Sequence, residues 1–194
     1  VVDCLEQRYP DFDGLNLTYE VREGIIRHNS SYDNPPHQEE FNNDQSPTLE
    51  AQVVDVADEI AYFSHDLDDG LTSRLLYEKD LENIDIWKES LSELSGRFNN
   101  LTDQMKRYQA LRGIINMFVT DIIEASSKRL KHFKIESLKD VRSQKMRIIY
   151  FSDYVAKKRD ILRDFLYNKF YMHYRVIRMS NKAKRFITEL FDIY

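Results

Sequence analysis

One stretch of the sequence, residues 50–71, combines carboxylates with a single phenol at regular spacing. No Lys or Arg lies between Glu50 and Gly70, so nothing in the stretch itself neutralises its negative charge. Like charges three or four residues apart destabilise a helix by about 0.2–0.5 kcal/mol per pair, and a divalent cation or basic partner would remove that repulsion. A solvated acidic face is the alternative interpretation. The spacing puts five of these side chains on one helix face: Asp55, Asp58, Tyr62, Asp66 and Asp69.

The adjacent residues His65 and Asp66 form a pair of the kind that can bind a catalytic metal. Adjacent side chains on a helix diverge by about 100°, however, so His65 is expected to point away from the face that holds Asp58. We therefore interpret His65 as a packing or surface residue. Neither His28 nor His37 is a better candidate for a metal ligand.

A helix is predicted to carry this acidic face. Ser46 followed by Pro47 predicts the start of the helix, with Ser46 as its N-cap, and Gly70 predicts its end. Opposite the acidic face we expect an apolar stripe that packs on the protein interior. Its members step by four and three residues: Leu49, Val53, Val56, Ile60, Phe63 and Leu67.

The rest of the sequence predicts further helices, so the expected fold class is all-α. No strand pattern of useful length and no internal repeat is present. The polar residues 29–47 contain three prolines and predict a long loop. Helices are expected over 15–29, with Asn16 or Thr18 as N-cap and Leu17, Val21 and Ile25 four apart; at one or two places around Trp87; over 97–133, with Leu111, Ile115, Phe118 and Ile122 in register; over 153–171; and from about 181 to 191.

The composition fits a soluble, helix-rich globular protein and excludes a disordered one. Of the 194 residues, 42% are apolar and 31% are charged. No apolar run approaches the roughly 20 residues that cross a bilayer, so no membrane partner is expected. A single cysteine, Cys4, excludes an internal disulfide and fits a reducing compartment, which predicts a cytoplasmic location.

The net charge of −5 conceals two halves of opposite charge. Residues 1–97 contain 7 Lys and Arg against 23 Asp and Glu, whereas residues 98–194 contain 21 against 10. Acidic residues suit a hard cation and basic residues suit phosphates, but solvated helix faces would explain both halves equally.

Three stretches of this sequence resemble one known family, in the right order. The stretch EAQVVDVADEIAYFSHDLDDGL at 50–71 resembles the last metal-binding helix of the deoxyguanosinetriphosphate triphosphohydrolase-like proteins, a branch of the HD-domain superfamily. Residues 8–28 resemble the segment before that helix, and residues 162–191 resemble the C-terminal helical region. The resemblance implies an HD-domain-type helical bundle, with 1–95 as the remaining part of its metal-binding core and 96–194 as a helical region for phosphate contacts and oligomerisation.

The resemblance also implies a reaction and its cofactor. Proteins of this family use a divalent metal, most often Mg²⁺ or Mn²⁺, held by a His, a His-Asp pair and a distant Asp. They hydrolyse a deoxynucleoside triphosphate, such as dGTP, to the deoxynucleoside and intact triphosphate. The metal polarises a phosphoryl oxygen and positions the attacking water.

Residue by residue, the resemblance assigns Asp58 as the distant metal ligand. Asp66 matches the residue that accepts a hydrogen bond from the 3′ hydroxyl of the deoxyribose, and Tyr62 matches the one that packs against the sugar and disfavours ribonucleotides. Arg107 and Arg112 are candidates for contacts with the triphosphate, because a guanidinium presents a planar fork of donors. No catalytic residue is identified within this chain.

Other basic residues are candidates for partner contacts. Lys128, Arg129, Lys131 and Lys134, together with the run Lys157-Lys158-Arg159, suit subunit contacts, an effector nucleotide or single-stranded DNA. The tyrosines of residues 167–174 are expected to serve packing or an oligomer interface. The resemblance implies a homo-oligomer, often a hexamer.

The family's upstream His and His-Asp motifs have no match in this sequence. The chain also begins at Val1 instead of Met, so we expect it to be the C-terminal part of a longer protein. One carboxylate does not hold a catalytic ion by itself, so the chain alone is expected to be inactive. The alternative is a non-catalytic helical module that binds nucleotide or nucleic acid and has lost the metal site.

Overall fold

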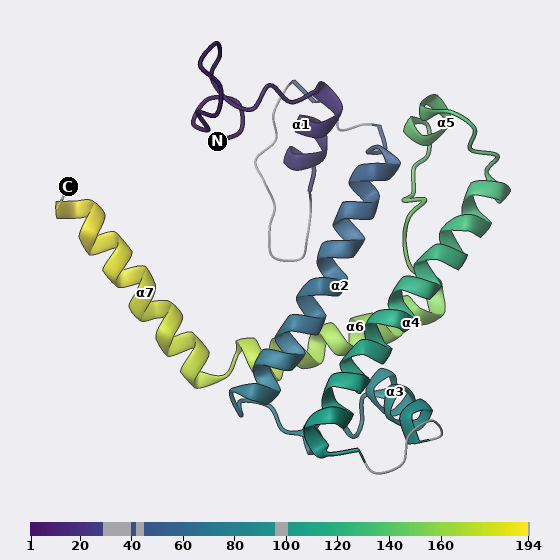
Figure 1. Ribbon diagram of the computed structural model, residues 1–194, viewed down its shortest axis with the longest axis vertical. Helices are drawn as coiled ribbons and strands as arrows, with labels where there is room; N and C mark the ends of the chain where they lie inside the picture. Colours follow the sequence, from purple (N-terminus) through teal and green to yellow (C-terminus); the bar gives the residue numbers. More distant parts are fainter. Residues whose placement is uncertain (29–39, 42–44, 96–100, 194) are drawn as a thin grey trace. The chain divides into compact units, whose positions relative to one another are not determined.

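The computed structural model describes residues 1–28, 40–41, 45–95 and 101–193, and in these residues the regular structure is helical (Figure 1). The all-α prediction is confirmed, since the described residues contain no strand beyond one isolated bridge between Gln7 and Gly14. No helix in the described ranges is long and apolar enough to cross a bilayer. The elements are α1 (Tyr19–Ile26), α2 (Leu49–Thr72), η1 (Glu78–Leu81), α3 (Asp85–Ser95), α4 (Asp103–His132), α5 (Leu138–Arg142), α6 (Asp153–Leu166), η2 (Tyr167–Tyr171) and α7 (Tyr174–Ile193).

The chain forms two compact units, and each unit is built from two separate stretches of sequence. The first unit contains Val1–Glu59 and Ile122–Tyr150, and the second contains Ile60–Asp121 and Phe151–Tyr194. The long helices α2 and α4 therefore each contribute residues to both units. The proposed boundary between residues 95 and 96 remains a prediction of the sequence.

The first unit is held together by a buried side-chain amide. Gln52 on α2 is fully buried, and its Oε1 accepts hydrogen bonds from the backbone N–H groups of Ile148 and Ile149 at 2.8 and 3.0 Å. Its Nε2 donates to the carbonyl of Pro47 at 2.9 Å and to Ser46 Oγ at 3.3 Å. Gln52 therefore supplies hydrogen-bond partners to the carbonyl of Pro47 and to the N–H groups of Ile148 and Ile149, which have no partner within a helix.

A buried ion-pair network closes the same unit. Glu23 of α1 is 2% exposed and accepts hydrogen bonds from Arg142 at 2.6 and 2.5 Å and from Arg27 at 2.9 Å. Burial by itself would raise the pKa of Glu23, but the hydrogen bonds from the two guanidinium groups lower it overall. Arg142 also donates to the carbonyl of Ser46, so the network joins α1, α5 and the entry to α2.

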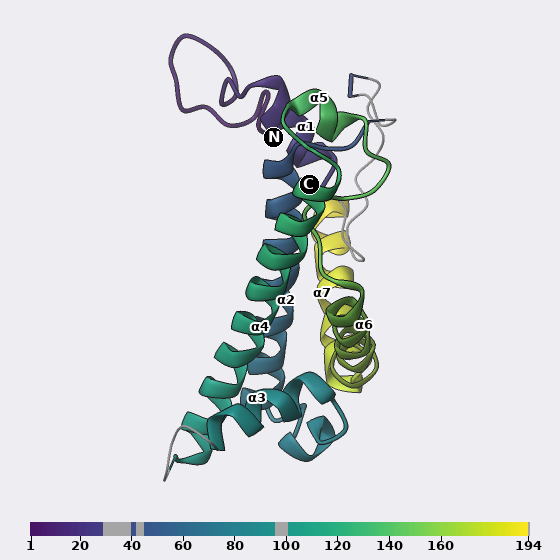
Figure 2. The same cartoon turned by 90° about the vertical axis from the view of Figure 1, so that its right-hand side faces the viewer.

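The second unit has a larger apolar core. In both views α3 lies beside the first half of α4, and the hydroxyl of Ser90 donates to the carbonyl of Ala110 at 2.7 Å (Figures 1 and 2). The rings of Phe118 and Phe151 meet edge to face at 5.3 Å between centroids. The largest fully buried side chains of this unit include Phe63, Leu67, Leu76, Leu81, Ile86, Trp87, Ile114, Phe118, Phe151, Leu162 and Leu166.

Two details of α2 differ from the prediction. The helix begins at Leu49, and Thr48 Oγ1 accepts from the N–H of Ala51 at 3.2 Å, so Thr48 caps it in place of Ser46. Ser46 instead accepts two hydrogen bonds, from Gln52 at its hydroxyl oxygen and from Arg142 at its backbone carbonyl. Along the expected apolar stripe Val56, Ile60, Phe63 and Leu67 are buried, but Val53 is 49% exposed, because the buried place near the start of the helix belongs to Gln52.

The predicted end of α2 at Gly70 is also wrong. The helix continues to Thr72, and the chain leaves it through Arg74, whose φ is +58°. The N–H groups of Arg74 and Leu75 bond back to the carbonyls of Leu71 and Gly70, which satisfies helix-terminal acceptors. Helix α4 ends in the same way, with Lys134 at φ +51°.

The remaining predicted segments are helical, but some of their bounds, caps and buried residues differ from the prediction. Within residues 15–28 the helix is α1 alone, and its apolar face is outward, since Val21 and Ile25 are about half exposed. Thr18 precedes α1 without a side-chain cap hydrogen bond. On α4 the predicted residues Leu111, Phe118 and Ile122 are buried, but Ile115 is exposed and Ile114 is buried in its place. The last helix begins earlier than expected, at Tyr174, and most of the predicted loop at 29–47 lies outside the described residues.

Candidate functional site

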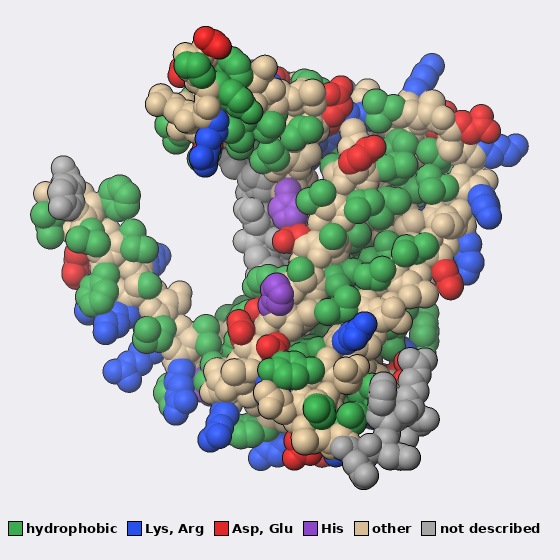
Figure 3. All heavy atoms as spheres, in the orientation of Figure 1, with side chains coloured by type: hydrophobic (Ala, Val, Ile, Leu, Met, Phe, Trp, Pro, Cys, Tyr) green, Lys and Arg blue, Asp and Glu red, His purple; other side chains and the backbone are tan. Residues whose placement is uncertain are grey.

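The acidic face of α2 contributes a compact cluster to the first unit. Asp55 is buried, and its carboxylate lies 2.6 Å from His28 Nδ1 and 2.8 Å from a guanidinium nitrogen of Arg147. The other ring nitrogen of His28, Nε2, is 3.6 Å from Asp58. Asp58 itself is 62% exposed, so its carboxylate is accessible to solvent. Histidine and acidic side chains gather along α2 in the space-filling view (Figure 3).

This geometry places His28 next to Asp58, which the sequence did not predict. Asp55 holds one nitrogen of the imidazole and leaves the other directed toward Asp58. A carboxylate that fixes a histidine ring in this manner is a common arrangement around metal ligands. The signal that could have identified it is the combination of a histidine just after a helix with two carboxylates three residues apart on the next helix.

The residues present fit a metal site only in part. The exposed carboxylate of Asp58 has the oxygen chemistry that Mg²⁺ or Mn²⁺ prefers. Among the described residues, however, no three His, Cys, Asp or Glu side chains come together in a geometry that could hold an ion. Asp58 therefore suits one ligand position, and further ligands would have to come from outside the described residues.

The second unit holds the other half of the acidic face. Tyr171 of η2 donates a hydrogen bond from its Oη to the carboxylate of Asp66 on α2. The ring of Tyr62 lies 6.0 Å from the ring of Tyr171, measured between centroids. Tyr62 remains 38% exposed, so one carboxylate and two phenol rings meet at an accessible surface. The resemblance in sequence assigned Tyr62 and Asp66 to substrate binding, and it missed Tyr171, for which packing or an oligomer interface was expected.

The environment of Asp66 perturbs its ionisation. Burial first, and then the neighbouring charge of Asp69, raises the pKa of Asp66 to about 6, although His65 acts in the opposite direction. Burial, and then the charge of Asp66, likewise raises the pKa of Tyr62. A carboxylate with a pKa near 6 changes its charge close to neutral pH, which is typical of functional sites as well as of buried ion-pair networks.

The two candidate arginines on α4 have different surroundings. Arg107 is largely buried, and its Nε lies 3.6 Å from Oδ1 of Asp68. Its guanidinium carbon lies 5.3 Å from the centre of the Tyr108 ring. Arg112 is exposed. His65 is exposed as expected and forms no part of the cluster around Asp58. The assignment of both arginines to phosphate contacts remains a prediction.

The basic run Lys157-Lys158-Arg159 is largely unavailable for partner contacts. Lys158 is 8% exposed, and its Nζ lies 2.5 Å from both carboxylate oxygens of Glu89. Arg159 is 7% exposed and packs over the ring of Phe151 at 5.5 Å. Two of the three cations therefore stabilise the interior of the second unit.

Comparison with curated proteins finds relatives along the whole chain. A deoxyguanosinetriphosphate triphosphohydrolase-like protein of Geobacter sulfurreducens is 40% identical over 195 residues, which covers 100% of this chain and 51% of that protein. Proteins with the same name from Ralstonia pickettii and Neorickettsia sennetsu are 38% and 35% identical and are covered to 50% and 51%. The chain is a relative of the deoxyguanosinetriphosphate triphosphohydrolase-like proteins. The resemblance predicted from three stretches of sequence is thereby confirmed.

A family model agrees with this relationship. The model described as a phosphohydrolase-associated domain matches residues 149–194, which include α6, η2 and α7. The chain spans about half the length of the triphosphohydrolase-like relatives that it matches. Their names and the family model together point to a phosphohydrolase family.

Proposed function

We propose that this chain is part of a metal-dependent phosphohydrolase that converts a deoxynucleoside triphosphate into the deoxynucleoside and triphosphate. The observation that carries the proposal is the hydrogen bond from Tyr171 to Asp66, next to the ring of Tyr62. Residues from α2 and η2, 105 positions apart in sequence, supply one carboxylate and two phenols at an accessible surface. A relative's name supports a triphosphate substrate, and the cluster supports recognition of its sugar.

Each member of the cluster has a role that its chemistry can perform. An ionised Asp66 accepts a hydrogen bond from the 3′ hydroxyl, and the rings of Tyr62 and Tyr171 present apolar faces to the sugar. A 2′ hydroxyl against such a ring would lose its hydrogen bonds to water, and that loss disfavours ribonucleotides. Tyr171 holds the Asp66 carboxylate in position when no sugar is bound.

Asp58 would hold the metal ion. The imidazole of His28, which is bonded to Asp55, would help to orient the Asp58 carboxylate. The family resemblance supports this division of roles, since it assigns Asp58 to the metal and Tyr62 and Asp66, four and eight residues later in the sequence, to the sugar. A bound divalent ion would supply Lewis-acid polarisation of the phosphoryl group. His28 keeps the Asp58 carboxylate from turning freely, because its ring is fixed by the buried Asp55.

The proposal is tested by the specificity of nucleotide binding. The protein expressed from its complete gene is titrated with dGTP and with GTP, and the affinities are compared with those of Tyr62→Ala. We expect the wild type to prefer the deoxynucleotide and Tyr62→Ala to lose most of that preference. Equal affinity of the wild type for dGTP and GTP would contradict the assignment and favour a module that binds nucleotides through phosphates alone.

A further inference from the structure

Arg147 lies in the segment between α5 and α6 and pairs with a buried carboxylate of α2. Its Nη1 lies 2.8 Å from Oδ2 of Asp55. Asp55 is 8% exposed, so its carboxylate has lost most of its hydration and depends on protein groups for compensation. A guanidinium is well suited to this task, because it stays charged and presents several N–H donors. Arg147 therefore supplies a positive charge next to a buried carboxylate, within the first unit.

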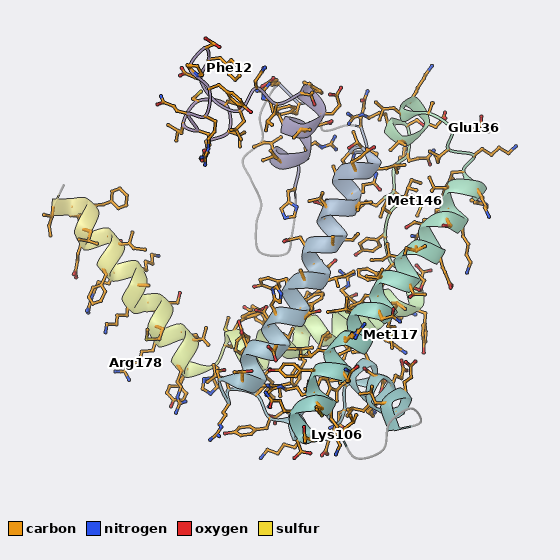
Figure 4. The ribbon with its side chains drawn as sticks, in the orientation of Figure 1. Phe12, Lys106, Met117, Glu136, Met146 and Arg178 are labelled. Atoms are coloured by element: carbon orange, nitrogen blue, oxygen red, sulfur yellow. The ribbon has the colours of Figure 1, made fainter. Side chains whose placement is uncertain are left out.

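Helix α2 also holds the backbone next to Arg147. Gln52, on the turn before Asp55, accepts hydrogen bonds at 2.8 and 3.0 Å from the backbone N–H groups of the two residues that follow Arg147. Residues three apart lie on the same side of a helix, so Gln52 and Asp55 bind the same short segment. Met146, the residue before Arg147, is labelled in Figure 4, where this segment runs beside α2. The guanidinium is therefore positioned by its backbone as well as by its charge.

Asp55 connects Arg147 to the histidine beside Asp58. One carboxylate oxygen, Oδ2, receives the guanidinium, and the other, Oδ1, lies 2.6 Å from Nδ1 of His28. A carboxylate that pairs with a guanidinium only accepts hydrogen bonds, so Nδ1 carries the proton of this contact. Nε2 of His28 then remains on the side of Asp58, at 3.6 Å from its Oδ2. The four side chains thus form one chain of contacts, and all of them belong to the first unit.

We propose that Arg147 is a positioning residue for the metal site of the proposed hydrolysis. It fixes the carboxylate of Asp55, which His28 alone would hold at only one oxygen. A fixed Asp55 holds the imidazole of His28, and the imidazole orients the carboxylate of Asp58. Removal of a partner that orients a metal ligand from outside its coordination shell typically lowers metal affinity by about 10- to 100-fold. The inference rests on the proposed function, because it concerns the site at which Asp58 would hold the ion.

A direct contact between Arg147 and the triphosphate is the competing role. The geometry favours positioning, because the guanidinium already compensates a buried carboxylate. A phosphate that drew the guanidinium away would leave Asp55 without this partner and would bring a second negative charge toward it, and both effects cost free energy. The two roles differ in what they change, since positioning acts on the metal ion and a phosphate contact acts on the nucleotide.

The test is the binding of Mn²⁺ to the protein expressed from its complete gene, measured without nucleotide from the electron paramagnetic resonance signal of the free ion. The test variant is Arg147→Met, which keeps an unbranched side chain and removes the charge. The matched control is Arg163→Met, because the Arg163 side chain is 30% exposed, close to the 32% of Arg147, and its Nη1 lies 3.1 Å from Asp160 in the second unit. Arg147→Lys keeps the charge and tests rescue, and Arg147→Gln provides a milder second test variant. Circular dichroism checks that every variant is folded.

We expect Arg147→Met to bind Mn²⁺ about tenfold more weakly than the wild type, with Arg147→Lys within about threefold of it and Arg163→Met unchanged. His28→Gln should also weaken binding, and Arg147→Met should add less than about twofold to that loss, because groups that act through one chain of contacts are not additive. A folded Arg147→Met that binds Mn²⁺ as the wild type does would overturn the proposal, and so would equal weakening in Arg163→Met. Full additivity with His28→Gln would overturn it in favour of a purely structural role.

The outcomes separate this inference from the proposed function. An unchanged Mn²⁺ affinity of Arg147→Met together with a raised KM for dGTP would assign Arg147 to a phosphate contact and overturn its positioning role. A wild type that binds Mn²⁺ through Asp58 and hydrolyses no nucleotide would refute the proposed reaction and leave the positioning role of Arg147 standing. Undiminished Mn²⁺ affinity in Asp58→Ala would remove Asp58 from the metal site and overturn both.

Discussion

Tyr171 donates a hydrogen bond to Asp66 across 105 residues of sequence. The contact joins the phosphohydrolase-associated segment to the acidic helix α2, and the two residues themselves lie in the second unit. It gives the polar face of α2 a structural partner, and in the proposed site it fixes one oxygen of the Asp66 carboxylate and leaves the other to accept a hydrogen bond from a sugar hydroxyl. The predictions that follow test this contact and the framework around it.

Removal of the Tyr171 hydroxyl should weaken substrate binding more than turnover. In Tyr171→Phe the ring stays and the hydrogen bond to the Asp66 carboxylate is lost, and a bond to a charged group contributes about 1.5–3 kcal/mol. We expect KM for the deoxynucleoside triphosphate to rise about tenfold and kcat to change little. Steady-state kinetics give both constants. The control is Tyr167→Phe, because Tyr167 is an exposed tyrosine of the same π-helix, η2. An unchanged KM in Tyr171→Phe would argue against a role of Tyr171 in binding.

Asp66→Asn should change the pH dependence of stability. The pKa of Asp66 is raised to about 6 by burial, so the folded protein disfavours its ionised form. This group's contribution to stability is complete below about pH 4 and is lost as the pH rises through 6. We therefore expect wild type and Asp66→Asn to be equally stable near pH 4 and the variant to be more stable by about 1 kcal/mol at pH 7, a value reduced for partial solvent screening. Urea unfolding at both pH values measures the difference, and a constant difference would contradict the raised pKa.

Gln52→Leu should destabilise the first unit strongly. The substitution keeps the size of the buried side chain and removes all four of its hydrogen bonds, which leaves the N–H groups of Ile148 and Ile149 without an acceptor. Each unsatisfied buried donor costs about 1–3 kcal/mol, so we expect the free energy of unfolding to fall by about 2–4 kcal/mol. Val53→Leu, at the exposed neighbouring position, should change it by less than about 0.5 kcal/mol. Denaturant unfolding of both variants tests the contrast.

Lys134→Gly should stabilise the protein. Lys134 adopts a φ of +51° at the end of α4, a conformation that costs an L-residue about 1 kcal/mol and glycine almost nothing. We expect a gain of about 0.5–1 kcal/mol in the thermal or chemical unfolding of the variant. Lys131→Gly, inside the last turn of the same helix, should instead lose about 1 kcal/mol. Destabilisation by both substitutions would indicate that the Lys134 side chain contributes more than its backbone strain costs.

The sequence was sufficient for the fold class and for the order of the helices, because apolar periodicity reports helices directly. It failed where a polar residue takes an interior position. Val53 lost its expected buried place to Gln52, since the amide reaches backbone groups near residue 148 that no local pattern reveals. The end of α2 was also missed, because Arg74 takes a backbone conformation that usually selects glycine.

The candidate site was predictable only where its residues lie on one helix. Asp58, Tyr62 and Asp66 share α2, so spacing alone groups them. Tyr171 and His28 approach this helix from elsewhere in the chain, and such tertiary contacts leave no mark in a single sequence. The same holds for Lys158, which looked like part of a surface run and is buried against Glu89.

The products of the reaction give the most direct test of the proposed function. The protein expressed from its complete gene is incubated with each deoxynucleoside triphosphate and Mg²⁺ or Mn²⁺, alongside Asp58→Ala, and the products are separated by ion-exchange chromatography. We expect a deoxynucleoside and intact triphosphate from the wild type and neither product from Asp58→Ala. No turnover of any substrate by the folded wild type, or undiminished turnover by Asp58→Ala, would contradict the proposed function.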